Sequence, residues 1–528
     1  MYDLQQPLGI GATRAICVND GQPLSVLMAA SEVVGFAKTG GLADVAGALP
    51  VALARRGIRA SIIMPLYRCA RQAKPAPQPT DHVLTVPVGK GVKHGRLWRT
   101  DLADGAVPVW LVEQNDYFDR DDVRAGRGIY NETRPDGSRC DYADNAERFL
   151  YFSRAVLEAL PVLRLWPDVL HVNDWQTGLV PVLLRELYRP LSDHFKHIYY
   201  DGIRTLFTIH NIAFQGNFPP QDLALTGLPQ RLFHFEQLEF HGQLSYLKAG
   251  IVFADLINTV SPTYAQEIQT PYYGHGLQGV LSAHRHRLSG IVNGVDYEVW
   301  DPRHDRHLAA RYGPDDLSGK AVCKAALQRE YGLTVDASVP LAGVVARLTQ
   351  QKGVDLIATI APGLLDQGCQ LVILGEGDAR FHTIFKDLRQ RYPDRFGLTL
   401  GFSEPLAHRI EAGVDLFLMP SAFEPSGLNQ LYSLRYGTPP IVRATGGLAD
   451  TVTDTNEQTL AAGTATGFRF SSYDAHALWL ACQRALGLWR ERPDLWRQVM
   501  RNGMRQDWSW DRSAAEYEAL YVRLCRNP

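Results

Sequence analysis

Short apolar runs alternate with helical patterns along almost the whole chain, and this alternation restricts the fold more than any other feature. The runs lie at residues 25–30, 62–65, 168–172, 206–210, 340–346, 371–374, 414–420 and 440–443. Most lead into a glycine turn or a polar residue and then into apolar residues at helical spacing. Strands that alternate with helices build parallel sheets with helices on both faces. Because the alternation starts afresh after residue 295, we predict an α/β fold of two doubly wound, Rossmann-like domains that face each other across a cleft.

The length and composition limit the class of protein further. The chain has 528 residues, which is enough for two full domains. We expect an N-terminal extension over 1–22 and a first domain over 23–294. A net charge of -2 does not favour nucleic acid or membrane as a partner, and seven cysteines without a CxxC pair favour a reducing compartment. No run is long enough to span a membrane and none resembles a signal peptide, so we expect a soluble, cytoplasmic protein.

One six-residue sequence occurs twice. Thr39 to Asp44 and Thr445 to Asp450 both read TGGLAD, each between an apolar run and a helical pattern. A glycine turn at a helix start can present backbone N–H groups to a phosphate, and Lys38 adds a positive charge at the first turn. The GxxxxGK[ST] spacing of a Walker A loop is absent. We expect the two turns to face one cleft. The alternative is that these are ordinary loop glycines, which would give the same sequence pattern.

Two further stretches place polar residues beside predicted strand ends. Glu424 and Ser426 follow the run 414–420 in a strand-to-helix turn, where Gly427 would allow a close backbone approach to a ligand. His171 lies beside Asn173 and Asp174, and we expect it at a strand end on the ligand side. For Glu424 the alternative is a solvated surface carboxylate, and for His171 it is a structural histidine of the core.

These residues together resemble one family. The sequence is similar to bacterial glycogen synthases and plant starch synthases, which are retaining glycosyltransferases with two Rossmann-like domains (GT-B). The resemblance covers nearly the whole chain from residue 25. Its motifs are residues 38–42, 171–175, 208–211, 293–296, 347–353, 423–425 and 445–448.

The resemblance implies a reaction and its partners. The expected enzyme is a retaining hexosyltransferase that moves glucose from ADP-glucose to the non-reducing 4-hydroxyl of an α-1,4-glucan such as glycogen. No metal and no other cofactor is implied. UDP-glucose as the donor stays an alternative, and a non-catalytic glucan-binding protein is the alternative from a different class. A glucan phosphorylase shares the architecture, but nothing in the chain matches its pyridoxal-binding lysine motif.

The resemblance also implies site residues. Arg347 and Lys352 match the two cations that stabilise the leaving diphosphate, Glu424 the carboxylate that holds the donor glucose, and His171 a residue near the sugar 6-hydroxyl. Phe402 matches an aromatic residue that stacks on the base. The complete set of expected substrate-binding residues is Lys38, Gly40, Gly41, Asp144, Asn145, Asn293, Phe402, Ser426, Gly427, Thr445, Gly446 and Gly447.

The chain departs from the family pattern at three positions near Glu424. Ala422, Ser426 and Asn429 stand where the family usually has Arg, Cys and Thr. Tyr432 stands eight positions after Glu424, where many related transferases have a second glutamate, as expected for glycogen and starch synthases. The tail resembles the family's C-terminal helix, so we expect a nucleotide-sugar domain over 295–505 and, over 506–528, a helix that crosses back to the first domain.

Overall fold

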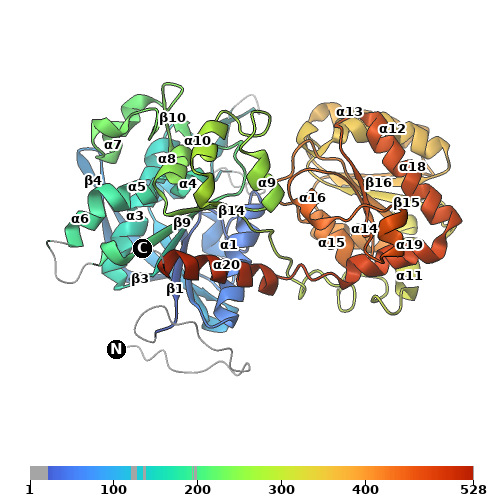
Figure 1. Cartoon of the computed structure of the whole chain (residues 1–528), viewed down its shortest axis with the longest axis horizontal. Helices are drawn as coiled ribbons and strands as arrows, with labels where there is room; N and C mark the ends of the chain where they lie inside the picture. Colours follow the sequence, from blue (N-terminus) through green and yellow to red (C-terminus); the bar gives the residue numbers. More distant parts are fainter. Residues whose placement is uncertain (1–21, 121–127, 135–137, 193, 195–198, 527–528) are drawn as a thin grey trace. The chain divides into compact units, whose positions relative to one another are not determined.

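The computed structural model describes residues 22–120, 128–134, 138–192, 194 and 199–526, and it divides into two compact units (Figure 1). Unit 1 comprises Met1–Thr259, Ile268–Ile291 and Trp510–Pro528, and unit 2 comprises Val260–Glu267 and Val292–Ser509. The main boundary between the two units therefore lies just after Ile291, whereas the sequence predicted that the first domain would end at residue 294. The extension expected over 1–22 lies outside the described residues apart from Gln22.

Unit 1 is built on a nine-stranded sheet in the order β14-β13-β9-β8-β1-β2-β5-β4-β3. The strands from β14 to β5 run parallel, and β4 and β3 extend the sheet antiparallel. Their bounds are β1 Ser25–Ala29, β2 Arg59–Pro65, β3 Gln78–Val88, β4 Gly91–Leu102, β5 Val107–Glu113, β8 Val169–Asn173, β9 Arg204–Ile209, β13 Leu256–Thr259 and β14 Leu288–Gly290. The chain adds strands outward from β1 on one side and from β8 on the other, so the topological switch point lies between β1 and β8.

Helices pack on this sheet because its parallel strands are apolar on both faces. The longest are α1 Gly41–Arg55, α3 Asn145–Leu163 and α20 Trp510–Arg526, with shorter segments at α2 Asn115–Phe118, α4 Asp174–Thr177, α5 Val180–Leu183, α6 Arg189–Ser192, α7 Leu223–Thr226, α8 Tyr246–Phe253 and α10 Gln278–Ala283. The C-terminal helix α20 lies beside α1 within unit 1 (Figure 1).

Unit 2 contains a six-stranded parallel sheet in the order β17-β16-β15-β18-β19-β20. The strands are β15 Leu341–Val345, β16 Gln370–Gly375, β17 Phe396–Leu400, β18 Leu416–Met419, β19 Pro440–Arg443 and β20 Phe468–Phe470. The helices are α9 Pro262–Glu267, α11 Ser318–Glu330, α12 Val354–Asp366, α13 Ala379–Arg391, α14 Glu404–Gly413, α15 Asn429–Arg435, α16 Gly446–Thr451, α17 Glu457–Ala461, α18 Ala475–Glu491 and α19 Pro493–Arg505. Here the switch point lies between β15 and β18. The predicted class, two doubly wound Rossmann-like domains, is confirmed.

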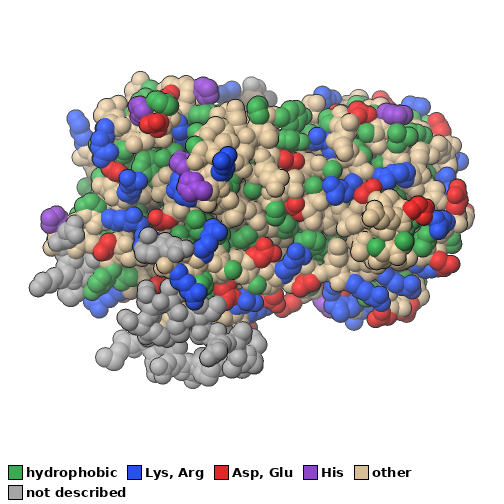
Figure 2. Space-filling model, in the orientation of Figure 1, with side chains coloured by type: hydrophobic (Ala, Val, Ile, Leu, Met, Phe, Trp, Pro, Cys, Tyr) green, Lys and Arg blue, Asp and Glu red, His purple; other side chains and the backbone are tan. Residues whose placement is uncertain are grey.

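The surface agrees with the balanced composition. Positive and negative side chains are interspersed on the face drawn in Figure 2. Among the described residues, no helix combines the length and the apolar character that a membrane crossing requires.

His171 is a core residue of unit 1. It lies in the middle of β8, not at the strand end as expected, and its side chain is completely buried. Its Nε2 is 2.7 Å from the Thr208 hydroxyl on β9, and its Nδ1 is 2.8 Å from the Tyr521 hydroxyl on α20. Burial lowers the pKa of His171 to about 3, so the ring is neutral and bonds neutral partners. This residue connects the C-terminal helix to the sheet.

Tyr521→Phe should therefore destabilise unit 1. The change leaves His171 Nδ1 buried without a partner, which costs roughly 1–3 kcal/mol of unfolding free energy. Tyr517→Phe is the matched control, because Asn258 loses only the 3.2 Å bond from Tyr517 and keeps its 2.7 Å bond from Thr208. Urea denaturation of both variants measures the difference. Equal stabilities would contradict the assigned role of His171.

Candidate active site

A cavity of about 200 Å³ opens in unit 2 at the carboxyl ends of β15 and β18. This is the switch point of the sheet, where open α/β sheets bind ligands. The cavity is lined by Val345, Ala346, Arg347, Lys352, Leu418, Met419, Ser421, Glu424, Leu428 and Asn429. Arg347, Lys352 and Glu424, three of the four residues matched above to the family's reaction centre, therefore line one cavity, and the fourth, His171, does not.

Glu424 is the buried charge of this cavity. Its side chain is 7% exposed, and its Oε2 accepts bonds from Lys352 Nζ at 2.6 Å and from Ser421 Oγ at 3.0 Å. A buried carboxylate is tolerated only with such partners. Arg347 differs, because it is exposed at the end of β15 and forms no ion pair within the described part of the chain. The site thus holds one neutralised ion pair and one surplus positive charge.

The main chain around Glu424 is packed against glycine turns. A Cβ at Gly353 would meet Pro420 O at 2.1 Å, and a Cβ at Gly446 would meet Glu424 O at 2.0 Å. A Cβ at Gly447 would lie 2.0 Å from Ser426 O. Only glycine fits at these contacts, and Gly353 and Gly446 also have the positive φ that glycine adopts without strain.

The second TGGLAD turn uses its donors inside the protein. Gly446 N donates to Glu267 Oε2 at 3.0 Å, and Thr445 Oγ1 donates to Glu267 Oε1 at 2.9 Å. Gly447 N donates to Glu424 O at 3.2 Å. The turn therefore supports the Glu424 main chain, whereas the sequence predicted that its N–H groups would be open to a phosphate.

The three residues that depart from the expected family pattern take part in the same packing. Asn429 Nδ2 donates to Val345 O at 2.5 Å, which connects the start of α15 to the end of β15. Ala422 contributes backbone bonds, its N donating to Gln351 O at 2.9 Å. The Ser426 hydroxyl accepts from Asn293 N at 3.4 Å. No described residue bonds the buried Oδ1 of Asn293, so this oxygen can accept a bond from a ligand.

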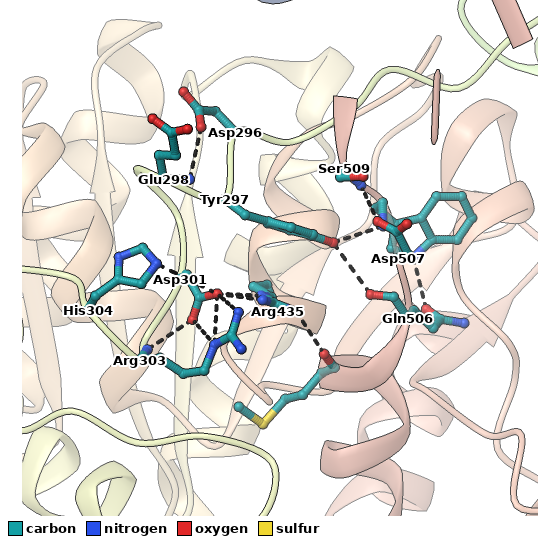
Figure 3. A network of polar contacts seen from close by, with 12 residues as sticks. Asp296, Tyr297, Glu298, Asp301, Arg303, His304, Arg435, Gln506, Asp507 and Ser509 are labelled. Atoms are coloured by element: carbon teal, nitrogen blue, oxygen red, sulfur yellow. Dashed lines mark hydrogen bonds and ion pairs between the residues drawn. The ribbon is translucent and has the colours of Figure 1, made fainter. Parts of the chain in front are cut away.

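The far end of α15 is fixed by the polar network of Figure 3. Arg435 bonds the buried Asp301 carboxylate and donates to Met504 O at 3.1 Å. Arg303 binds the same carboxylate at 2.6 Å. Burial would raise the pKa of Asp301, but the bonds from both arginines bring it down to about 2. The carboxylate therefore stays charged and anchors the helix that follows Glu424.

Phe402 does not line this cavity. It follows β17 at the edge of the sheet, and its side chain is 86% exposed. An exposed aromatic side chain is available to stack on a base, but this role stays a prediction.

In unit 1 the first TGGLAD turn follows the switch-point strand β1. Lys38 Nζ lies 2.6 Å from Asp44 Oδ1 in an exposed pair, which holds the lysine only weakly. Added Cβ atoms at Gly40 and Gly41 would meet nothing within 4 Å, so these glycines leave open space where the second turn has close contacts. The buried Glu32 carboxylate holds the turn, accepting from Thr39 Oγ1 at 2.6 Å and from Gly40 N at 3.1 Å.

Asp144 and Asn145 occupy the start of α3. Asp144 pairs with Arg120 at the surface, with Nη1 and Oδ1 3.0 Å apart. Asn145 is buried, donates to Tyr130 O at 2.8 Å and accepts from Arg148 at 2.6 Å. The Tyr130 hydroxyl in turn donates to Glu32 Oε1 at 2.7 Å, so Asn145 is tied to the first turn through one tyrosine.

His210 and Asp174 occupy the position at which His171 was expected. Both follow strand ends, and His210 Nε2 lies 2.9 Å from Asn173 Oδ1. Asp174 has a φ of 54°, an uncommon backbone conformation for a residue other than glycine, and it accepts from His210 N at 2.7 Å. Burial raises the pKa of Asp174 to about 7. Strain and a shifted pKa at a switch point are typical of functional residues. The sequence signal was the polar pair His210 and Asn211, which follows the apolar residues of the run that starts at 206.

Comparison with known proteins gives one consistent family. Residues 25–283 match the starch synthase catalytic domain, and residues 333–498 match the glycosyl transferases group 1 domain. The glycogen synthase of Syntrophotalea carbinolica is 48% identical over 94% of this chain and 98% of its own length. A glycogen synthase of Anaeromyxobacter dehalogenans is 49% identical, with 95% and 99% covered.

A solved structure agrees with these relatives. The catalytic domain of starch synthase IV from Arabidopsis thaliana, bound to ADP and acarbose, superimposes with a TM-score of 0.84. It is 34% identical in sequence, and the match covers 96% of this chain and 99% of that one.

Asp174→Asn should change how stability depends on pH. The folded pKa of Asp174 is raised from 3.8 to about 7, so between these values the unfolded state releases a proton that the folded state keeps. Because of this proton, the free energy of unfolding of the wild type falls as pH rises through that window. Asparagine does not titrate, so it removes this pH dependence, and it still accepts from His210 N and tolerates a positive φ. The melting temperature of the variant minus that of wild type should rise from pH 4 to pH 7 and then level off. A difference that does not vary with pH would mean that Asp174 is ionised throughout.

Proposed function

This chain belongs to the glycogen and starch synthase family of glycosyltransferases, and on that premise we propose that it elongates an α-1,4-glucan with glucose from ADP-glucose, retaining the anomeric configuration. The observation that carries the proposal is the unit 2 cavity, in which Arg347, Lys352 and Glu424 meet at the switch point. Such a site suits a sugar diphosphate, because it offers cations for the phosphates and a carboxylate for the glucose hydroxyls.

The donor assignment has two supports. The starch synthase relative of solved structure was bound to ADP, and 34% of its aligned residues are identical to this chain. In this chain a surplus positive charge at Arg347 accompanies the neutral Lys352–Glu424 pair. A diphosphate would add negative charge beside Arg347 and Lys352, where the two cations would stabilise it.

The proposed step is attack on the face from which the diphosphate departs. The bond between the anomeric carbon and the phosphate oxygen breaks, and the 4-hydroxyl oxygen of the acceptor bonds the same carbon. The acceptor proton passes to the departing phosphate oxygen, so no protein nucleophile is required. Arg347 and Lys352 would stabilise the charge that grows on the diphosphate, and Glu424 would hold the glucose by its hydroxyls.

Unit 1 would bind the sugar chain. The role first expected of His171 passes to His210, which stands at a strand end beside Asn173 and the strained Asp174. Burial lowers the pKa of His210 to about 3, so its neutral ring would contribute hydrogen bonds to a sugar hydroxyl. Lys38, at the open first turn, would add a charge for the donor. We also propose a cytoplasmic location, consistent with free thiols at every described cysteine.

A donor screen tests the proposal directly. With glycogen as acceptor, ADP-glucose should support initial rates well above those with UDP-glucose. Equal rates, or faster transfer from UDP-glucose, would contradict the donor, and no transfer from either donor would contradict the enzyme class.

Single substitutions test the charged centre. Arg347→Ala and Lys352→Ala should each lower kcat about 10²- to 10³-fold, which corresponds to roughly 2.7–4 kcal/mol of lost transition-state stabilisation. Glu424→Ala should lower kcat on the order of 10²-fold, because the glucose leaves its reactive pose. Initial rates with saturating donor measure each effect.

A control separates chemistry from folding. Arg380→Ala removes an exposed arginine at the start of α13, outside the cavity lining, and should keep wild-type kcat. Near-normal turnover in all three cavity variants would place the catalytic centre elsewhere.

A further inference from the structure

In each unit, the TGGLAD turn is held by a glutamate that lies outside the TGGLAD sequence. In unit 1, Glu32 accepts from Thr39 Oγ1 with Oε1 and from Gly40 N with Oε2, at 2.6 and 3.1 Å. In unit 2, Glu267 accepts from Thr445 Oγ1 with Oε1 and from Gly446 N with Oε2, at 2.9 and 3.0 Å. The same two donors therefore bind the same two carboxylate oxygens in both units. Because the same hydrogen-bond geometry occurs with the same six-residue sequence in both units, we attribute it to the TGGLAD sequence itself.

Glu267 is the last residue of α9, and the motif holds that helix at both ends. The Asp450 carboxylate, which ends the second TGGLAD sequence, accepts from Thr263 N at 3.1 Å and from Thr263 Oγ1 at 2.6 Å at the start of α9. At the other end, Glu267 returns to Thr445 and Gly446. The short helix and the turn thus fix each other.

The turn transmits this support to the catalytic main chain. Gly447 N donates to Glu424 O, and an added Cβ at Gly446 would lie only 2.0 Å from the same carbonyl. A shift of the turn would therefore move the Glu424 backbone, because no space separates them. Burial raises the pKa of Glu267, whereas the bonds from Thr445 and Gly446 and the charge of Arg443 oppose that shift and favour the carboxylate.

From these contacts we propose that Glu267 is a positioning residue, which sets the place of the Glu424 carboxylate through the second TGGLAD turn. The inference rests on the proposed function of Glu424. Glu267 itself touches no substrate in this scheme. Its contribution is geometric, so its loss lowers turnover more than donor affinity.

Glu267→Ala tests the proposal in the full chain. Loss of the carboxylate frees Thr445 and Gly446, and the resulting misplacement of Glu424 should lower kcat about 10- to 100-fold. The KM for ADP-glucose should stay within about threefold of wild type, because Arg347 and Lys352 remain. Glu267→Gln should restore most of the rate, since its amide oxygen can accept from Gly446 N and its NH₂ can donate to the Thr445 hydroxyl.

Thr263→Val is the matched control on the same helix. It removes one bond that caps α9 and leaves both bonds from Glu267 to the turn, so kcat should stay within about twofold of wild type. If Thr263→Val lowers kcat as far as Glu267→Ala does, the packing of α9 is responsible and the proposal is wrong. If Glu267→Ala instead lowers the KM for ADP-glucose at unchanged kcat, Glu267 competes with the donor, which also overturns it.

Amide hydrogen exchange distinguishes this inference from the proposed function. In Glu267→Ala, peptides that cover residues 424–428 and 445–448 should exchange faster than in wild type and in Thr263→Val, whether or not the protein transfers glucose. An inactive wild type would contradict the proposed function alone, while unchanged exchange in Glu267→Ala would contradict the inference alone. If Glu267→Ala does not fold, Thr445→Val decides. It removes one of the two bonds, so a kcat severalfold below wild type supports the proposal and an unchanged kcat overturns it.

Discussion

The unit 2 site depends on direct contact between backbone segments. The stretch from Pro420 to Ser426 is enclosed by turns at Gly353 and at Gly446 and Gly447, with no side chain between them. Such contacts are available only to glycine, and they leave the enclosed loop little room to shift. Lys352 immediately precedes one of these glycines, so the turn that encloses the loop also carries its ion-pair partner.

The sheet topology explains why the site lies where it does. In each unit the chain builds outward from one strand and then returns to build on its other side, which leaves a gap between the two connections at the carboxyl edge. In unit 2 this edge holds Arg347 and Glu424, and in unit 1 it holds Glu32 and Asp174. The repeated TGGLAD sequence occupies different positions relative to these edges. The first copy follows the switch-point strand β1, whereas the second follows β19 and reaches the site by supporting a neighbouring loop.

The alternation of apolar runs and helices was sufficient to predict two Rossmann-like domains, because parallel strands must be apolar on both faces. The resemblance to the family also picked out Arg347, Lys352 and Glu424, which line one cavity in unit 2. From their local sequence alone the two cations would have passed for surface charges at a helix start. Sequence could not assign the histidines. His171 and His210 both lie beside polar residues in the sequence. Only the strand bounds and the side-chain bonds show that His171 lies mid-strand between Thr208 and Tyr521, whereas His210 follows the end of β9. Nor could sequence find Glu32 or Glu267, because a glutamate that binds a turn far along the chain has no local pattern.

Electrostatics explains how each unit can hold buried or half-buried carboxylates beside the turns and the cavity described above. Glu32, Glu267 and Glu424 each accept at least two hydrogen bonds from fixed donors, so much of their charge is already compensated within the protein. Compensation of this kind is local, and it limits the repulsion that each carboxylate would exert on a diphosphate nearby. Lys352 is shared between Glu424 and the expected phosphate, so it is held in position before the donor arrives. Arg347 is exposed near this pair and forms no ion pair among the described residues, so its positive charge is available to an anion. On the proposed function, stabilisation of a leaving diphosphate by Arg347 and Lys352 would therefore require little rearrangement, which is the condition under which a preorganised charge contributes most to a rate.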